Sequence, residues 1–180
     1  MIQRIQTLWL LLAFIGLTMV FVFPAVTFHS ETVAGYAVDG ALNLIPKHNP
    51  DMLAQIESGG DVVMDQSGYI HTWPLAVLAG LAAVLALVCI FMFRNRVLQM
   101  RMVAVAFLVN VVYVFLLLFW GIDKFDDAFK AFAAQMGCDG ASMSYTLGTW
   151  LPLVTIVLLM MAQRGIKKDE AKVRAADRLR

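Results

Sequence analysis

The three histidines of this chain are the most obvious candidates for a chemical role, because imidazole binds transition metals and transfers protons near neutral pH. His29, His48 and His71 are scattered along the sequence, whereas a metal site needs clustered ligands. His29 and His71 bracket one polar segment, so they could become neighbours if strands beside them pair, with Glu31 close by. We favour the simpler interpretation, in which all three are solvated or structural. The sequence predicts no metal site.

The remaining reactive groups form no catalytic pattern. Cys89 lies in an apolar run and Cys138 in a polar segment, which places them on opposite sides of a membrane and excludes a disulfide within one chain. Asp123, Asp126 and Asp127 fit the negatively charged first turn of a helix. No nucleophile elbow, zinc motif, phosphate loop or dinucleotide fingerprint occurs. We therefore expect no catalytic residue, no cofactor and no enzyme activity.

The elements that position these reactive groups are four long runs without a charged side chain. The runs cover residues 5–28, 72–93, 102–122 and 140–163. Each holds about 20 residues or more, which is the length that crosses roughly 30 Å of hydrocarbon as a helix. With 61% hydrophobic and 15% charged residues, a soluble helical bundle is disfavoured. The sequence predicts a mainly α membrane protein, one domain over 1–180, whose four-transmembrane-helix bundle has spans at about 5–28, 72–93, 102–122 and 143–163.

The distribution of charge predicts orientation, because cytoplasmic loops retain Lys and Arg during insertion. Eleven of the 14 Lys and Arg residues precede the first run, lie between the second and third, or follow the fourth. Both termini are then cytoplasmic. The first run is too long for the apolar core of a cleaved signal peptide and lacks a small-x-small site, so we interpret it as a retained anchor. The net charge of +1 gives no indication of nucleic-acid binding.

The first outer segment, 29–71, predicts a small antiparallel sheet of three to five strands. Strands at 26–33, 36–38 and 41–45 would be joined partly by an Asp39-Gly40 hairpin turn. Asn49-Pro50 predicts the start of a short helix over 51–56, stopped by Gly59-Gly60. A second hairpin would pair 61–64 with 68–71 around a turn at 65–67.

The second outer segment, 123–137, predicts a short amphipathic helix. Its apolar face comprises Phe125, Phe129, Phe132 and Met136, which recur at helical spacing. This face must lie on the bilayer interface, on the outer sheet or on another protein. The sequence favours the first two over the third.

Small and polar residues within the spans indicate how the helices pack. The second span has a small-residue face of Ala76, Ala79, Gly80, Ala83 and Ala86, which lets helix backbones approach closely within the chain or against a partner. No ionisable residue of the kind an ion-coupled transporter uses lies inside the predicted spans. Asn110 and Tyr113, three apart on one helix face, predict an interhelical hydrogen bond.

The tail, 167–180, predicts a helix with mixed charges and a weak apolar stripe that includes Val173, Ala176 and Leu179. One interpretation is a solvated helix held at anionic lipid. The other is a docking helix for a cytoplasmic partner.

The two ends of the chain, Met1-Ile2-Gln3-Arg4-Ile5-Gln6-Thr7-Leu8 and 168–180, resemble an uncharacterised family of small four-span bacterial inner-membrane proteins, a domain of unknown function. The resemblance implies a bacterial cytoplasmic membrane, with the outer segments in the periplasm, and supplies no activity or functional residue. The layout also looks like that of claudin-type tetraspan proteins, although their Trp and paired Cys signature is missing here.

Polar sequence concentrated outside the predicted spans favours a non-enzymatic accessory or scaffold subunit of a membrane assembly. Its expected partners are the lipid bilayer and a protein in the membrane or cytoplasm, and a homo-oligomer is compatible with the sequence. The alternative is an oligomeric channel or transporter component, and an intramembrane enzyme ranks third.

Overall fold

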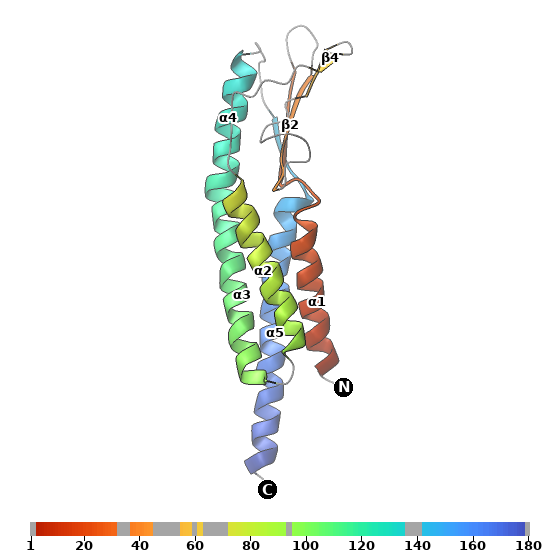
Figure 1. Ribbon diagram of the computed structural model, residues 1–180, viewed down its shortest axis with the longest axis vertical. Coiled ribbons are helices and arrows are strands. Elements are labelled where there is room, and N and C mark those ends of the chain that lie inside the picture. The colour runs from red at the N-terminus through yellow and green to blue at the C-terminus, as the bar shows by residue number, and fades with distance from the viewer. Residues whose placement is uncertain are drawn as a thin grey trace. The chain divides into compact units, whose positions relative to one another are not determined.

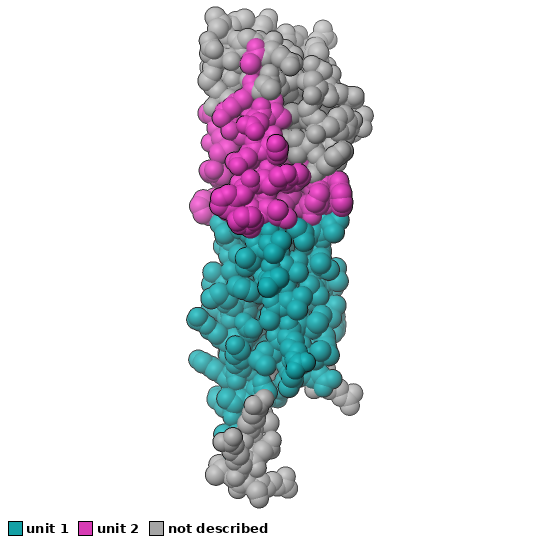
Figure 2. Space-filling model, turned by 90° about the vertical axis from the view of Figure 1, so that its left-hand side faces the viewer, with its two compact units in different colours: residues 1–19, 77–114, 151–180 teal, residues 20–76, 115–150 magenta. Residues whose placement is uncertain are grey.

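The computed structural model describes residues 3–31, 37–44, 55–58, 61–62, 72–92, 95–135 and 142–178, and these are mainly helical (Figure 1). They divide into two compact units, which Figure 2 shows in different colours. The first, here the helical unit, comprises residues 1–19, 77–114 and 151–180. The second, here the sheet unit, comprises residues 20–76 and 115–150.

The helical unit is built from α1 (Gln3–Met19) and from most of α2 (Trp73–Phe91), α3 (Arg96–Leu116) and α5 (Leu147–Arg178). Apolar residues make up most of these helices, and no Asp or Glu occurs in the first turn of any of them. One core cluster joins Leu10, Cys89, Val103 and Leu159, which lie on four different helices. The four helices therefore share a common interior.

Among the described residues, three helices are long and apolar enough to cross a membrane: Trp73–Phe91, Arg96–Lys130 and Leu147–Lys172. Helix α1 has 17 residues, or about 25 Å at 1.5 Å per residue, which is the short end of the range for a span. The prediction of a first span reaching Phe28 was too long. Pro24 disfavours a helical conformation at the residue before it, and the chain continues from Val26 as a strand.

The sheet unit contains an antiparallel sheet in the strand order β4-β3-β2-β1-β5, which confirms the predicted antiparallel sheet. The strands are β1 (Val26–Glu31), β2 (Ala37–Leu42), β3 (Gln55–Ser58), β4 (Asp61–Val62) and β5 (Ser142–Tyr145). Strand β1 pairs on one side with β2, from Val26↔Leu42 to Glu31↔Ala37, and on the other side with β5.

The predicted hairpin turn at Asp39-Gly40 was wrong, because both residues lie within β2. Gly40 pairs directly with Phe28 of β1, and an aromatic ring beside a strand glycine compensates for the missing side chain. Asp39-Gly40 is thus part of a paired strand. The link between β1 and β2 comprises residues 32–36, which lie outside the described residues.

The predicted helix over 51–56 was also wrong where it can be compared, since Gln55 and Ile56 belong to β3 and pair with β2. Ser58 pairs with Asp61, so Gly59-Gly60 connects two paired strands, a use of Gly-Gly that is typical of hairpins. Residues 51–54 and the predicted turn and strand over 65–71 lie outside the described residues.

Strand β5 was missed because its residues are uncharged and were counted into the fourth span. Ser142–Tyr145 pairs with β1, from Val26↔Tyr145 to His29↔Ser142, and helix α5 begins only at Leu147. The span predicted from residue 143 therefore starts later. Absence of charge does not separate an edge strand from the adjoining apolar helix.

The third span and the amphipathic helix predicted over 123–137 form one uninterrupted helix. Helix α3 passes through the π-turn η1 (Leu117–Gly121) into α4 (Ile122–Gln135). Leu117, Gly121, Phe125 and Phe129 are all buried, at intervals of four that would drift around an ideal α-helix. The i→i+5 bonds of the π-turn absorb roughly one extra residue, which helps to keep these side chains on one face.

Candidate functional site

In the helical unit, Asn110 of α3 is hydrogen-bonded to Thr155 of α5, and Tyr113 follows Asn110 by three residues on α3. These three residues are here called the polar cluster. All three residues are fully buried. Asn110 Nδ2 donates to Thr155 Oγ1 at 2.7 Å and to the carbonyl oxygen of Pro152 at 3.2 Å. The predicted interhelical hydrogen bond is therefore present for Asn110, with a partner that the sequence did not identify.

Pro152 explains why Thr155 is part of this cluster. The Thr155 hydroxyl donates to the Pro152 carbonyl at 2.7 Å, a bond to the preceding turn that Ser and Thr commonly make in helices. Its lone pairs remain available to accept from Asn110. The sequence signal that could have identified Thr155 as the partner of Asn110 is thus a Thr three residues after a proline in an apolar helix.

Two polar atoms of the cluster have no hydrogen-bond partner among the described residues, namely Asn110 Oδ1 and Tyr113 Oη. A buried polar atom left in this state costs about 1–3 kcal/mol, and most such atoms in native structures are satisfied by protein or by ordered water. Tyr113 thus does not make the direct interhelical bond predicted for it.

A second set of polar contacts holds the other helix ends of the same unit. Gln6 Nε2 of α1 donates to Asp169 Oδ2 of α5, and both residues are buried. Gln99 Nε2 of α3 donates to the Cys89 carbonyl of α2 at 2.9 Å. The first contact anchors the start of the tail to α1, and the second joins α3 to α2. Lys167, Lys168 and Lys172 of α5 are exposed.

The small-residue face of α2 is used within the chain at three of its five predicted positions. Ala79, Ala83 and Ala86 are buried, and Ala76 and Gly80 are half-buried. Ala82, which was not predicted, is buried too and shares a core cluster with Leu17 of α1, Ala83 and Ala86. Alanine allows the helices to approach closely, so this face is interior packing.

In the sheet unit, the apolar face of α4 packs on the sheet. The Phe28 ring of β1 lies 4.9 Å from the Phe125 ring and 5.0 Å from the Phe129 ring, centroid to centroid. These three side chains, here the aromatic cluster, are buried. Of the three surfaces predicted for this helix face, the outer sheet is therefore the one that Phe125 and Phe129 contact. The Phe132 side chain and Met136 lie outside the described residues.

The start of α5 is held by a group of hydrogen bonds that the sequence did not predict. Thr146 Oγ1 and Thr149 Oγ1 donate to the Ala25 carbonyl at 3.0 and 2.5 Å, and Gly148 N donates to the Pro24 carbonyl at 3.1 Å. Thr146 Oγ1 also donates to the Pro24 carbonyl. The link between α1 and β1 thus accepts the free N–H group of Gly148 at the helix start, and two threonine hydroxyls as well.

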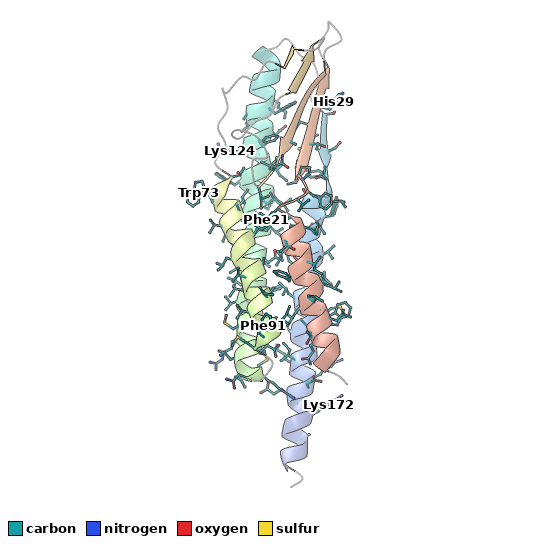
Figure 3. All side chains as sticks on the ribbon, turned by 45° about the vertical axis from the view of Figure 1, so that its right-hand side comes forward. Phe21, His29, Trp73, Phe91, Lys124 and Lys172 are labelled. Carbon is teal, nitrogen blue, oxygen red and sulfur yellow. The ribbon has the colours of Figure 1, made fainter. Side chains whose placement is uncertain are left out.

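None of the remaining candidate residues assembles into a chemical site within the described part of the chain. No group of three or more His, Cys, Asp or Glu there could hold a metal ion, and His29 is an exposed residue of β1 (Figure 3). His48, His71 and Cys138 lie outside the described residues. Of the docking candidates, Val173 and Ala176 lie in α5, but their side chains and Leu179 are also outside them.

Comparison with known proteins gives one informative result. No curated protein matches the chain. The family model described as Domain of unknown function (DUF4293) matches residues 2–179, which is nearly the whole chain and agrees with the resemblance seen at both ends. The chain therefore belongs to this family, a domain of unknown function.

Proposed function

We propose that this chain is a multi-pass protein of a bacterial cytoplasmic membrane, with four spans and both termini in the cytoplasm. Three helices have the length and composition of spans. In α1, the fourth, Leu8, Leu11, Leu12 and Ile15 are exposed. An apolar surface on a helix of 17 residues suits contact with lipid in a span at the short end of the range.

Cysteine labelling tests this topology at residues that are exposed in the structure. His29, Lys124 and Lys172 are labelled in Figure 3, and each would be replaced by Cys in a background without Cys89 and Cys138. A membrane-impermeant maleimide added to spheroplasts is expected to label positions 29 and 124, and to label 172 only after the membrane is opened. A fourth variant, Arg4→Cys, tests the short helix α1. Labelling of positions 4 and 172 from opposite faces would overturn the four-span proposal.

Within that membrane, the proposed role is a non-enzymatic accessory or scaffold subunit. The observation that carries this proposal is that Asn110, Gln99 and Gln6 direct polar bonds to helices of the same chain. Exposed charged residues of the helical unit include Lys167, Lys168 and Lys172 on the tail, and Arg101 on α3. A partner is then recognised by the tail and not by a site inside the bundle.

The structure sharpens the test of tail docking. Removing 167–180 would also remove Asp169, which is bonded to Gln6, so the informative truncation ends at Lys172 and deletes only 173–180. A photo-crosslinking residue at exposed Ala175 should trap a discrete protein in native membranes. The same residue at exposed Leu108 in α3 is the control and should trap lipid. Crosslinks at Ala175 that reach lipid alone would contradict the proposal.

The alternative role is an oligomeric channel or transporter component. The observation in its favour is that Asn110 Oδ1 and Tyr113 Oη are buried without a hydrogen-bond partner among the described residues. Polar groups within a span mark solute pathways in many membrane proteins. Purified protein in liposomes would be tested for ion and small-solute flux. Flux that Asn110→Leu abolishes and Thr18→Val preserves would support this alternative over the scaffold. Thr18 is a fair control because its hydroxyl bonds only to its own helix, at Phe14 and Ile15.

A further inference from the structure

The unpaired atoms of the polar cluster are a consequence of its geometry. If the Asn110 amide were flipped, its oxygen would face the Pro152 carbonyl oxygen at the 3.2 Å now spanned by a hydrogen bond, and two acceptors would repel. Thr155 has one hydroxyl proton, which already goes to the Pro152 carbonyl. Asn110 Nδ2 therefore points at Thr155 and Pro152, and Oδ1 must point elsewhere.

Tyr113 supplies the complementary group. It lies three residues after Asn110 on α3, so the two side chains share one helix face. Its hydroxyl can donate and accept, and at 0% exposure bulk water does not reach it. Phenylalanine would fill the same space without the cost of burying a hydroxyl, and a hydrogen-bond partner for the hydroxyl would offset that cost.

We infer that Asn110 and Tyr113 form a binding site for one internal water molecule in the helical unit. The water donates to Asn110 Oδ1 and accepts from Tyr113 Oη, so both unpaired atoms are satisfied. Buried waters typically make two to four hydrogen bonds to polar groups of this kind. The site does not depend on the scaffold role, because it requires only these two side chains. A structural water here would leave the channel alternative without the unpaired atoms that favour it.

Removal of the tyrosine hydroxyl distinguishes a hydrated site from a dry one by the sign of the effect. Tyr113→Phe is expected to raise the unfolding equilibrium constant of the full chain in mixed micelles about fivefold, as for loss of one net hydrogen bond. Tyr145→Phe is the matched control, since Tyr145 is exposed and should change the constant by less than about twofold. An unchanged or lower constant for Tyr113→Phe would overturn the inference, because an unpartnered hydroxyl is removed without loss.

Two further measurements test whether the water is shared. In an Asn110→Leu background, Tyr113→Phe should lose its effect, because the water has lost its acceptor. The same fivefold effect in both backgrounds would contradict a shared water. Water-edited NMR in deuterated lipid should transfer magnetisation from water to the Asn110 side-chain amide, with weaker transfer in Tyr113→Phe. A protein that shows no such transfer would also refute the site.

Discussion

The helical unit and the sheet unit place the same residue types in opposite environments. In the sheet unit, Phe28, Phe125 and Phe129 form the buried core. In the helical unit, Phe91 is 71% exposed (Figure 3), whereas Asn110 and Thr155 are 0% exposed. The core of the sheet unit thus contains a cluster of three Phe rings, whereas the core of the helical unit contains alanine, an amide and the buried Tyr113.

This contrast shows which interaction holds each unit together. Burying Phe rings is favourable where the surrounding solvent is water. Where the solvent is hydrocarbon, burial of an apolar side chain gains little, and close packing with interhelical hydrogen bonds takes over. We therefore expect truncation of a buried aromatic residue to destabilise the sheet unit most. In the helical unit, we expect changes in small or polar residues to have the larger effect on stability.

The largest expected effect comes from Phe125→Ala. Truncating a buried Phe typically costs about 3–5 kcal/mol, and Phe125 packs on Phe28 of the sheet. Hydrogen-exchange mass spectrometry should show amides of β1 and β2 exchanging at least about a hundredfold faster. The control is Phe91→Ala, because an exposed side chain in the helical unit should leave exchange in α2 nearly unchanged. Equal effects of the two variants would contradict the proposal that water surrounds the sheet unit and hydrocarbon surrounds the helical unit.

The next effect is expected from a pair of glycines, both in α5. A Cβ at Gly148 would lie 2.6 Å from the Pro24 carbonyl carbon and 2.8 Å from the Phe23 carbonyl oxygen. Backbone cannot yield easily, so Gly148→Ala should destabilise by about 1–3 kcal/mol, the usual range for overpacking. A Cβ at Gly165 would meet the Gln6 side chain at 3.0 Å, which can move. Gly165→Ala should be close to neutral, since better helix propensity offsets the contact.

A thermal or detergent-unfolding series on the two variants and the parent would check this ordering. If Gly165→Ala were the more harmful, the Gln6 side chain, and not the Pro24 backbone, would be the rigid partner. That outcome would place the tighter packing in the helical unit.

These examples also show how much the sequence could predict. The charge-free runs located the four long helices, and the spacing of Phe125 and Phe129 identified the apolar face of α4. The interhelical bond of Asn110 followed from its polarity within a span. Turn chemistry gave the wrong prediction at Asp39-Gly40 because pairing with β1, where Gly40 lies opposite Phe28, places the dipeptide within a strand.

Other features depend on contacts between segments far apart in the chain. Thr146 and Thr149 meet the Ala25 carbonyl, and Gln6 meets Asp169, although neither pair is marked by a local motif. Strand β5 was missed because its hydrogen bonds to β1, not its composition, set it apart from helix α5. Burial of Ala82 beside the predicted face shows that α2 packs on more than one side.

A smaller effect is expected from Thr155→Val, which keeps the shape and removes the hydroxyl. Asn110 Nδ2 then loses its 2.7 Å bond and keeps only the Pro152 carbonyl. Interhelical hydrogen bonds in membranes contribute about 0.6 kcal/mol on average and at most about 1.7 kcal/mol, so the loss should be near 1 kcal/mol. Thr18→Val is the control and should cost less, because Thr18 bonds within its own helix. Equal costs would mean that the bond between Asn110 and Thr155 adds nothing to the coupling of α3 with α5 beyond the bond to the Pro152 carbonyl.

The smallest expected effect comes from a charged pair in the sheet unit. Lys130 Nζ lies 2.6 Å from Asp126 Oδ2, one turn earlier on α4, and the Lys130 side chain is 61% exposed. Water solvates such a pair almost as well when it is broken. Lys130→Gln should therefore leave the melting midpoint unchanged within error, at both low and high salt. A clear loss that high salt does not reduce would show that this end of α4 is shielded from water, and the proposed contrast between an aqueous sheet unit and a lipid-facing helical unit would then need to be redrawn along α4.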